Sequence, residues 1–139
     1  MRQTGAAFFI TLLLIALWAY TASSKILDLQ GFTKTLRQHA LIGRGADVVA
    51  WTVPLTELAI VLLLLFTQTR ILGLWASFGL LVLFTVYLGY MLLFEPHLPC
   101  SCGGVIGSMS WGEHLFFNLC FVVLTLVALK CTHYKKFHA

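Results

Sequence analysis

Most of the charged residues in this sequence stand in short segments that separate four long apolar stretches. A helix needs about 20 mainly apolar residues to cross the roughly 30 Å hydrocarbon core of a bilayer. Each stretch is near that length, and none shows the alternating polarity that is typical of a membrane β-barrel. The sequence therefore predicts an all-α integral membrane protein, a bundle of four transmembrane helices over residues 6–22, 48–67, 71–94 and 111–131.

The composition excludes the common soluble classes of protein. Sixty per cent of the 139 residues are hydrophobic and only 10% are charged, whereas about a quarter are charged in an ordinary soluble domain. So few charges cannot solvate a globular surface of this size, which excludes a soluble enzyme, a disordered chain and a nucleic-acid-binding domain. The length fits a single membrane domain over residues 1–139, and we expect a lipid bilayer around it.

The first apolar stretch has a second interpretation. Arg2, an apolar run and then the small residues Ala22 and Ser23 also match a secretory signal peptide with its cleavage site. We favour a retained transmembrane helix, because the apolar run is long for a signal peptide and Lys25 is a natural helix end.

The sequence gives little information on which side of the membrane each connection lies. The nine Lys and Arg residues divide almost evenly between the two sides, so the positive-inside rule decides little. The third connection, residues 95–110, has neither Lys nor Arg, which favours placing it outside the cell and both termini in the cytoplasm. In this orientation Trp18, Trp51 and Trp111 are expected at the outer interface.

Two of the connections have a local pattern. In the first, apolar residues recur at spacings of three and four while Lys34 and Arg37 fall elsewhere, which predicts a short amphipathic interfacial helix over about 28–41. In the third, Pro and Gly residues forbid regular structure, and Ser110 with Glu113 then forms a capping box that opens the fourth helix.

The cysteines are the main candidates for chemistry. Two of the four, Cys100 and Cys102, form a Cys-Ser-Cys in the third connection. A disulfide between cysteines one residue apart closes a very small ring, stores strain and is easily reduced, as in catalytic disulfides. It also constrains almost no chain, so a structural staple is the weaker interpretation. Two thiols without a function are a further alternative.

Metal binding is another interpretation of the same loop. His97 and His114 bracket Cys100 and Cys102, and two thiolates with two imidazoles form a tetrahedral site for zinc or a soft site for Cu(I). The spacing is Cys-x-Cys rather than the usual Cys-x₂-Cys, and His114 could equally bond a loop carbonyl. The sequence leaves this alternative open.

Two residues inside the spans are candidates for supporting roles. Glu57 is the only carboxylate deep in a span, so it should face the bundle interior and have a partner. It could relay protons, orient a redox site, or bond backbone freed by Pro54, and we expect the last. Cys120 lies at a similar depth, and we expect it to be a small apolar filler.

Electron exchange needs a further participant. Cys120 and Cys131 are too far apart on one helix to form a second dithiol. A partner protein or a quinone would then have to exchange electrons with Cys100 and Cys102. No cofactor is otherwise evident in the sequence.

At the level of motifs, the chain resembles two related groups of membrane proteins. The segments Ser24-Lys25-Ile26-Leu27-Asp28 and Pro54-Leu55-Thr56-Glu57-Leu58 look like the DoxX-like proteins. The segments Pro99-Cys100-Ser101-Cys102-Gly103-Gly104 and Met109-Ser110-Trp111, with His114 and Asn118, look like the branch typified by the methylamine-utilisation protein MauE. Such proteins are regarded as redox-associated, and the resemblance covers almost the whole chain.

The resemblance implies a specific role for the cysteine pair. Cys100 and Cys102 would exchange electrons with an extracytoplasmic thioredoxin-like protein and support maturation of exported, disulfide-containing proteins. Of the two, we favour Cys102 as the attacking thiolate because two glycines, Gly103 and Gly104, follow it. The location would be the inner membrane of a bacterium. Whether the chain is itself an enzyme, of thiol–disulfide oxidoreductase type, stays open. The alternatives are a non-catalytic scaffold or maturation subunit, a copper- or zinc-binding membrane protein, and a transporter that uses Glu57 as its coupling acid.

Overall fold

The computed structural model describes residues 5–39, 41–94 and 110–137, and this part of the chain is helical almost throughout. His97, Cys100 and Cys102 lie outside the described residues. The elements in chain order are α1 (Gly5–Leu27), α2 (Leu29–Arg37), a short 3₁₀ turn (Gly43–Gly45), α3 (Ala46–Leu65), α4 (Arg70–Phe94) and α5 (Trp111–Phe137). The predicted all-α bundle with four membrane-spanning helices is confirmed.

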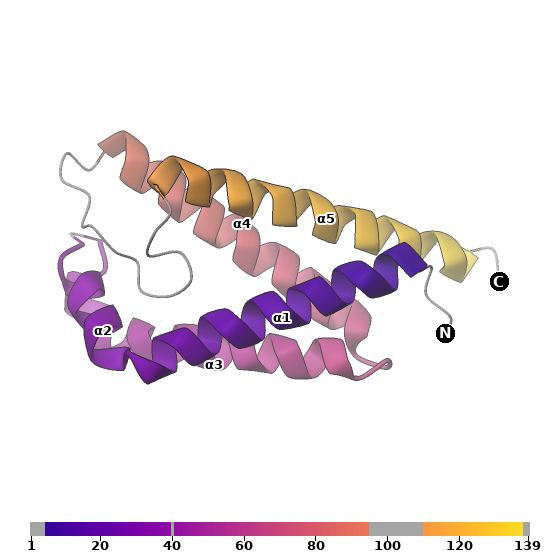
Figure 1. Ribbon diagram of the computed structural model, residues 1–139, viewed down its shortest axis with the longest axis horizontal. Helices are drawn as coiled ribbons and strands as arrows, with labels where there is room; N and C mark the ends of the chain where they lie inside the picture. The colour runs from indigo at the N-terminus through magenta and orange to yellow at the C-terminus, as the bar shows by residue number, and fades with distance from the viewer. Residues whose placement is uncertain (1–4, 40, 95–109, 138–139) are drawn as a thin grey trace.

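The four long helices run up and down in sequence and form one bundle (Figure 1). α1 lies against α3 and α5, and α4 lies against α3 and α5. The start of α1, the end of α5 and the α3–α4 connection share one end of the bundle. At the opposite end lie α2, the last turn of α4 and the first turn of α5.

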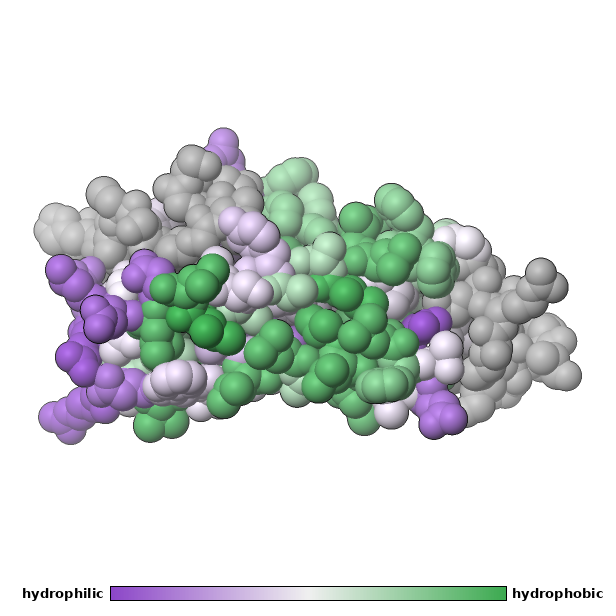
Figure 2. Space-filling view, turned by 60° about the horizontal axis from the view of Figure 1, so that its bottom comes forward, coloured by the Kyte–Doolittle hydropathy of each residue, from purple (hydrophilic) through white to green (hydrophobic). Residues whose placement is uncertain are grey.

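The surface of the bundle is that of a protein solvated by lipid. Large apolar side chains are exposed on all four long helices, for example Phe9 on α1, Leu62 on α3, Leu83 on α4 and Phe116 on α5. Figure 2 shows hydrophobic residues along the middle of one face and hydrophilic residues gathered toward its ends. Helices that are apolar on the outside as well as the inside are stable in a bilayer and not in water. The protein is therefore an integral membrane protein.

The helix α1 is an integral part of this bundle. It continues to Leu27, five residues beyond the predicted end at residue 22. Leu14 on α1 is fully buried in the core that α1 shares with Leu64 of α3, Leu74 of α4 and Ala128 of α5. α1 thus contributes to the core, and its extension carries Lys25 into the bundle.

The position of Trp18 differs from the interfacial one that the sequence suggests. Its side chain is 2% exposed, and its indole Nε1 donates a hydrogen bond to Ser77 Oγ on α4 at 3.0 Å. Tryptophan favours membrane interfaces because its N–H needs a polar partner. Here Ser77 is that partner inside the bundle, which allows the ring to be buried. The prediction of an interfacial Trp18 is wrong.

The connection between α3 and α4 is short because side chains of its own complete the end of α3. Thr69 Oγ1 donates to the carbonyl of Leu63 at 2.9 Å, and Arg70 Nε donates to the carbonyl of Leu64 at 3.1 Å. The last carbonyls of a helix have no partner within the helix. Thr69 and Arg70 supply those partners, so only four residues separate the end of α3 at Leu65 from the start of α4 at Arg70.

The two predicted local patterns at the other end are present. Asp28 is the N-cap of α2 and accepts a hydrogen bond from Gly31 N at 3.1 Å, while Leu36 on the apolar face of α2 packs against Ala46 and Ala50 of α3. The amphipathic helix is thus confirmed, over Leu29–Arg37.

The capping box at the start of α5 is also confirmed. Ser110 N donates to Glu113 Oε2 at 2.8 Å, and Glu113 N donates to Ser110 Oγ at 3.3 Å. The two reciprocal bonds satisfy backbone donors of the first turn. They define where α5 begins without any contribution from the rest of the bundle.

The helices α3 and α4 approach each other closely at Gly73. A Cβ atom at this position would lie 3.0 Å from Leu64 N and 3.1 Å from Leu63 C, which are backbone atoms and cannot rotate away. A Cβ at Gly79 on the same helix would meet nothing within 4 Å. The two glycines therefore form a matched pair for testing this contact.

We predict that Gly73→Leu destabilises the bundle and that Gly79→Leu does not. The leucine at position 73 would force α3 and α4 apart, and overpacking of this kind costs about 1–3 kcal/mol. The leucine at position 79 would extend toward lipid. Unfolding of the purified protein in mixed micelles would measure both changes, and equal stability of the two variants would contradict a close α3–α4 contact at Gly73.

Candidate functional site

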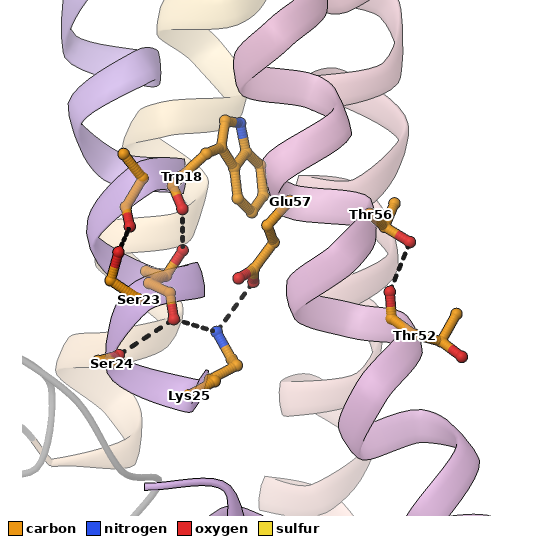
Figure 3. A network of polar contacts seen from close by, with 9 residues as sticks. Trp18, Ser23, Ser24, Lys25, Thr52, Thr56 and Glu57 are labelled. Carbon is orange, nitrogen blue, oxygen red and sulfur yellow. Dashed lines mark hydrogen bonds and ion pairs between the residues drawn. The ribbon is translucent and has the colours of Figure 1, made fainter. Parts of the chain in front are cut away.

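An ion pair lies between α1 and α3 inside the bundle (Figure 3). Lys25 Nζ on α1 is 2.9 Å from Glu57 Oε1 on α3. The side chain of Glu57 is fully buried and that of Lys25 is 16% exposed. Among the described residues the other ion pair, between Arg37 and Asp47, is on the surface with both side chains largely exposed. The buried pair is thus the strongest electrostatic feature of the bundle interior.

The Lys25 ammonium has further partners around it. It donates to the carbonyl of Thr21 at 3.4 Å, and it lies over the ring of Phe32 on α2, 5.8 Å from the ring centroid. A carboxylate, a carbonyl and an aromatic face replace much of the water that the ammonium loses on burial. The Thr21 side chain also hydrogen-bonds the Glu57 carboxylate. The oxygen Glu57 Oε2 is buried and makes no close, well-aligned hydrogen bond within the described residues.

The partner of Glu57 differs from the one that we expected. The sequence suggests backbone freed by Pro54, and Pro54 does lie buried inside α3. The hydrogen bonds that the structure gives to Glu57 come from the side chains of Lys25 and Thr21 instead. Lys25 can reach it because α1 continues beyond residue 22. The expectation of a backbone partner is therefore wrong, and that of an inward-facing, partnered acid is right.

A cavity of about 330 Å³ surrounds the ion pair. Its walls are mainly apolar and aromatic and come from all five helices. The aromatic and larger apolar lining residues include Leu17, Trp18, Phe32, Leu36, Val53, Leu81, Phe84, Leu88 and Phe117. Ligand sites in proteins have this composition, an apolar enclosure with a few convergent polar groups.

Further polar residues line the cavity. His39, which follows α2, is 3% exposed and contacts the ring of Tyr87 on α4 edge-on, at 6.1 Å between centroids. His114 and Asn118 come from α5, one turn apart. Asn118 is 6% exposed, and its amide nitrogen Nδ2 has no hydrogen-bond partner among the described residues. The cavity thus holds an unpaired buried donor beside the buried carboxylate of Glu57.

The predicted site residues are only partly brought together. Glu57 and His114 line the same cavity. Cys120 does not line it: this free cysteine is exposed on α5, so its predicted role as a filler of the core is wrong. Within the described part of the chain, no three His, Cys, Asp or Glu residues lie close enough to hold a metal. His97, Cys100 and Cys102 lie outside that part.

The cavity lies toward one end of the bundle. It is lined by the last turns of α1, by α2, and by the first half of α3, the second half of α4 and the first turns of α5. In the sequence, Cys100 and Cys102 fall between the end of α4 and the start of α5. The candidate site in the described part of the chain is the cavity with its ion pair.

The comparison with protein families agrees with this combination of features. The family model of methylamine utilisation protein MauE matches residues 3–131, nearly the whole chain. This chain belongs to the MauE family. No curated protein and no solved structure shows a significant match to it. Membership of the MauE family is consistent with an accessory or maturation role at a membrane.

Sequence reasoning missed three residues of the site. The charge pattern places Lys25 only at a helix end, and no sequence motif includes His39 or Tyr87. A signal for Lys25 existed, because a lone acid in a span demands a basic partner and Lys25 follows the first span directly. His39 and Tyr87 have no such signal, since only the packing of α2 against the long helices brings them to the cavity.

The ion pair leads to a prediction of coupled stabilities. We expect Lys25→Met and Glu57→Leu each to destabilise the protein, because each leaves one buried charge without its partner, at a cost of about 3–5 kcal/mol in other proteins. The double variant, with neither charge, should regain most of the loss. Unfolding of the purified variants in detergent would measure these differences.

The exposed ion pair of Arg37 and Asp47 provides the control for the Lys25 and Glu57 variants. Arg37→Met and Asp47→Leu remove an exposed ion pair and should change stability by only about 0–1 kcal/mol. Coupling between the two charges would be contradicted if the Lys25/Glu57 double variant were no more stable than the less stable of the two single variants.

Proposed function

We propose that this MauE-family protein exchanges electrons between thiols and disulfides at a bacterial inner membrane, through Cys100 and Cys102, and so supports maturation of exported proteins. The observation that carries the proposal is the Cys-x-Cys motif inside the region matched by the MauE family. Cys120 and Cys131 cannot serve instead, because they lie on one helix about 16 Å apart along its axis. The dithiol must therefore be Cys100 with Cys102.

The proposed chemistry is a reversible two-electron exchange. The Cys102 thiolate attacks a sulfur of a partner disulfide, and a mixed disulfide forms as the other partner sulfur leaves as a thiolate. The Cys100 thiolate then attacks Cys102 Sγ and releases the partner dithiol. The partner gains two electrons and two protons, and the Cys100–Cys102 pair loses them. The reverse sequence of steps reduces Cys100 and Cys102.

A thioredoxin-like protein outside the cytoplasm is the partner that fits this chemistry. Disulfides persist in oxidising compartments, and the 95–110 connection has no Lys or Arg, which favours the outer side. We accordingly place both termini in the cytoplasm. A non-catalytic accessory subunit is the second candidate, because family membership alone supports it, and the tests below separate the two.

The first test is the redox behaviour of the cysteine pair. In a Cys120→Ser/Cys131→Ser background, Cys100 and Cys102 should titrate together, and an alkylation-shift assay over a series of redox poises should show one two-electron transition. Cys100→Ser is the control and should abolish the transition. If Cys100 and Cys102 stay reduced at every redox potential that is found outside the cytoplasm, the result would favour a non-catalytic accessory subunit.

The second test is the orientation of the chain. An impermeant maleimide applied to intact cells after mild reduction should label Cys102 and leave Cys131 unlabelled, because Cys131 lies near the end of the bundle that carries both termini. Permeabilised cells are the control and should show labelling at both cysteines. Labelling of Cys131 alone in intact cells would reverse the orientation and move the proposed exchange to the cytoplasm.

A further inference from the structure

We propose that the cavity between the helices binds the ring of a lipophilic quinone. The proposal is carried by a buried donor, Asn118 Nδ2, that has no hydrogen-bond partner among the described residues and lines an apolar cavity. Buried polar groups in native proteins are nearly always bonded, so an unpaired donor beside such a cavity indicates a ligand with an acceptor. The same cavity holds the buried Glu57 carboxylate, which Lys25 and Thr21 contact.

The size and walls of the cavity restrict the ligand to a single substituted ring. About 330 Å³ is at the lower end of the range of ligand sites, roughly 300–1,000 Å³. Trp18, Phe32, Phe84 and Phe117 contribute aromatic surface on which a flat ring can pack. Because lipid surrounds the bundle, a ligand that enters from the bilayer must itself be lipophilic.

The polar atoms restrict the chemistry of that ring. Asn118 Nδ2 needs an acceptor, and a ring carbonyl oxygen is one. The Glu57 carboxylate can accept a further hydrogen bond, and a ring hydroxyl is a donor. A quinone has the carbonyls and its quinol has the hydroxyls, so the two redox forms of one molecule suit both groups. A phospholipid acyl chain offers neither an acceptor nor a donor.

The Lys25 ammonium adds an electrostatic contribution. It lines the same cavity and is held in place by Glu57 Oε1, the Thr21 carbonyl and the ring of Phe32. A fixed cation in an apolar cavity stabilises negative charge that develops nearby. Ring oxygens become more negative as a quinone accepts electrons, so the position of Lys25 suits a ligand that is reduced in place.

The redox consequence of quinone binding rests on the proposed function. Oxidation of the Cys100–Cys102 dithiol to the disulfide releases two electrons and two protons, and reduction of one quinone to its quinol consumes the same number. Cys120 and Cys131 cannot form a second dithiol, so the cysteine pair needs such an external acceptor to turn over repeatedly. The binding proposal itself depends only on the described cavity.

Binding can be measured with the purified full-length chain and decylubiquinone, a short-tailed quinone, by its quenching of tryptophan fluorescence, since Trp18 lines the cavity. We expect saturable binding. Decylbenzene, which has a similar tail and no ring oxygens, should compete at least tenfold more weakly. Equal competition by decylbenzene, or quenching that does not saturate, would overturn the proposal in favour of a cavity that takes acyl chains or nothing.

Two variants on one turn of α5 test the polar contact. Asn118→Leu keeps the size of the side chain but removes the donor, and should weaken decylubiquinone binding about three- to tenfold, the usual effect of one hydrogen bond. Phe116→Leu changes an exposed side chain and should leave binding unaltered. Unchanged binding by Asn118→Leu would remove Asn118 from the site and overturn the quinone assignment.

A variant that fills the cavity provides a second test. Val53 lines the cavity, and Val53→Phe should place a ring in the proposed binding space and abolish saturable binding. A folded Val53→Phe protein that binds decylubiquinone as tightly as the wild type would place the ligand elsewhere and overturn the proposal. Asn118→Leu keeps the proposal testable if Val53→Phe does not fold.

Removal of the cysteine pair separates this inference from the proposed function. The Cys100→Ser/Cys102→Ser protein should bind decylubiquinone as the wild type does, because the cavity residues are unchanged. Quinone binding with a pair that does not titrate would refute the thiol–disulfide function alone. A pair that titrates in a protein without saturable quinone binding would refute the cavity proposal alone.

Discussion

The ion pair between Lys25 and Glu57 is the interaction on which the arrangement of this bundle depends. A bilayer supplies no water to solvate a charge, so an acid deep in a span must find a cation inside the protein. The extension of α1 past the expected end of the first span, and its packing against α3, meet that requirement. Phe32 of α2 lies against the same ammonium group. The cavity forms around this pair, because the two charged groups and the aromatic rings beside them leave space that apolar side chains do not close.

Features encoded over a few residues could be predicted from the sequence. The four spans follow from where charges are absent, and the capping box of Ser110 and Glu113 follows from two residues at a fixed spacing. The amphipathic α2 follows from its spacing of apolar residues. Each of these depends on the local chain and on the surrounding solvent, which the composition already identifies as lipid. Membership of the MauE family was likewise readable from short motifs.

Features that depend on how helices face one another could not be predicted in this way. Trp18 is buried because Ser77, 59 residues away in the sequence, accepts a hydrogen bond from its indole N–H. No residue near Trp18 in the sequence indicates that partner. Cys120 points outward because the rotation of α5 is set by its contacts with α1 and α4. In a soluble protein polarity would reveal that rotation. In a bilayer the outside of a helix is as apolar as the inside, so the sequence pattern loses this information.

The bundle is closed at one end and hollow at the other. At Gly73 the backbones of α3 and α4 nearly touch, whereas Leu81 and Leu88 of α4 border the cavity. The missing side chain at Gly73 is therefore what lets α3 and α4 pack backbone to backbone at one end. The cavity begins about 12 Å further along α4, at Leu81, at 1.5 Å per residue.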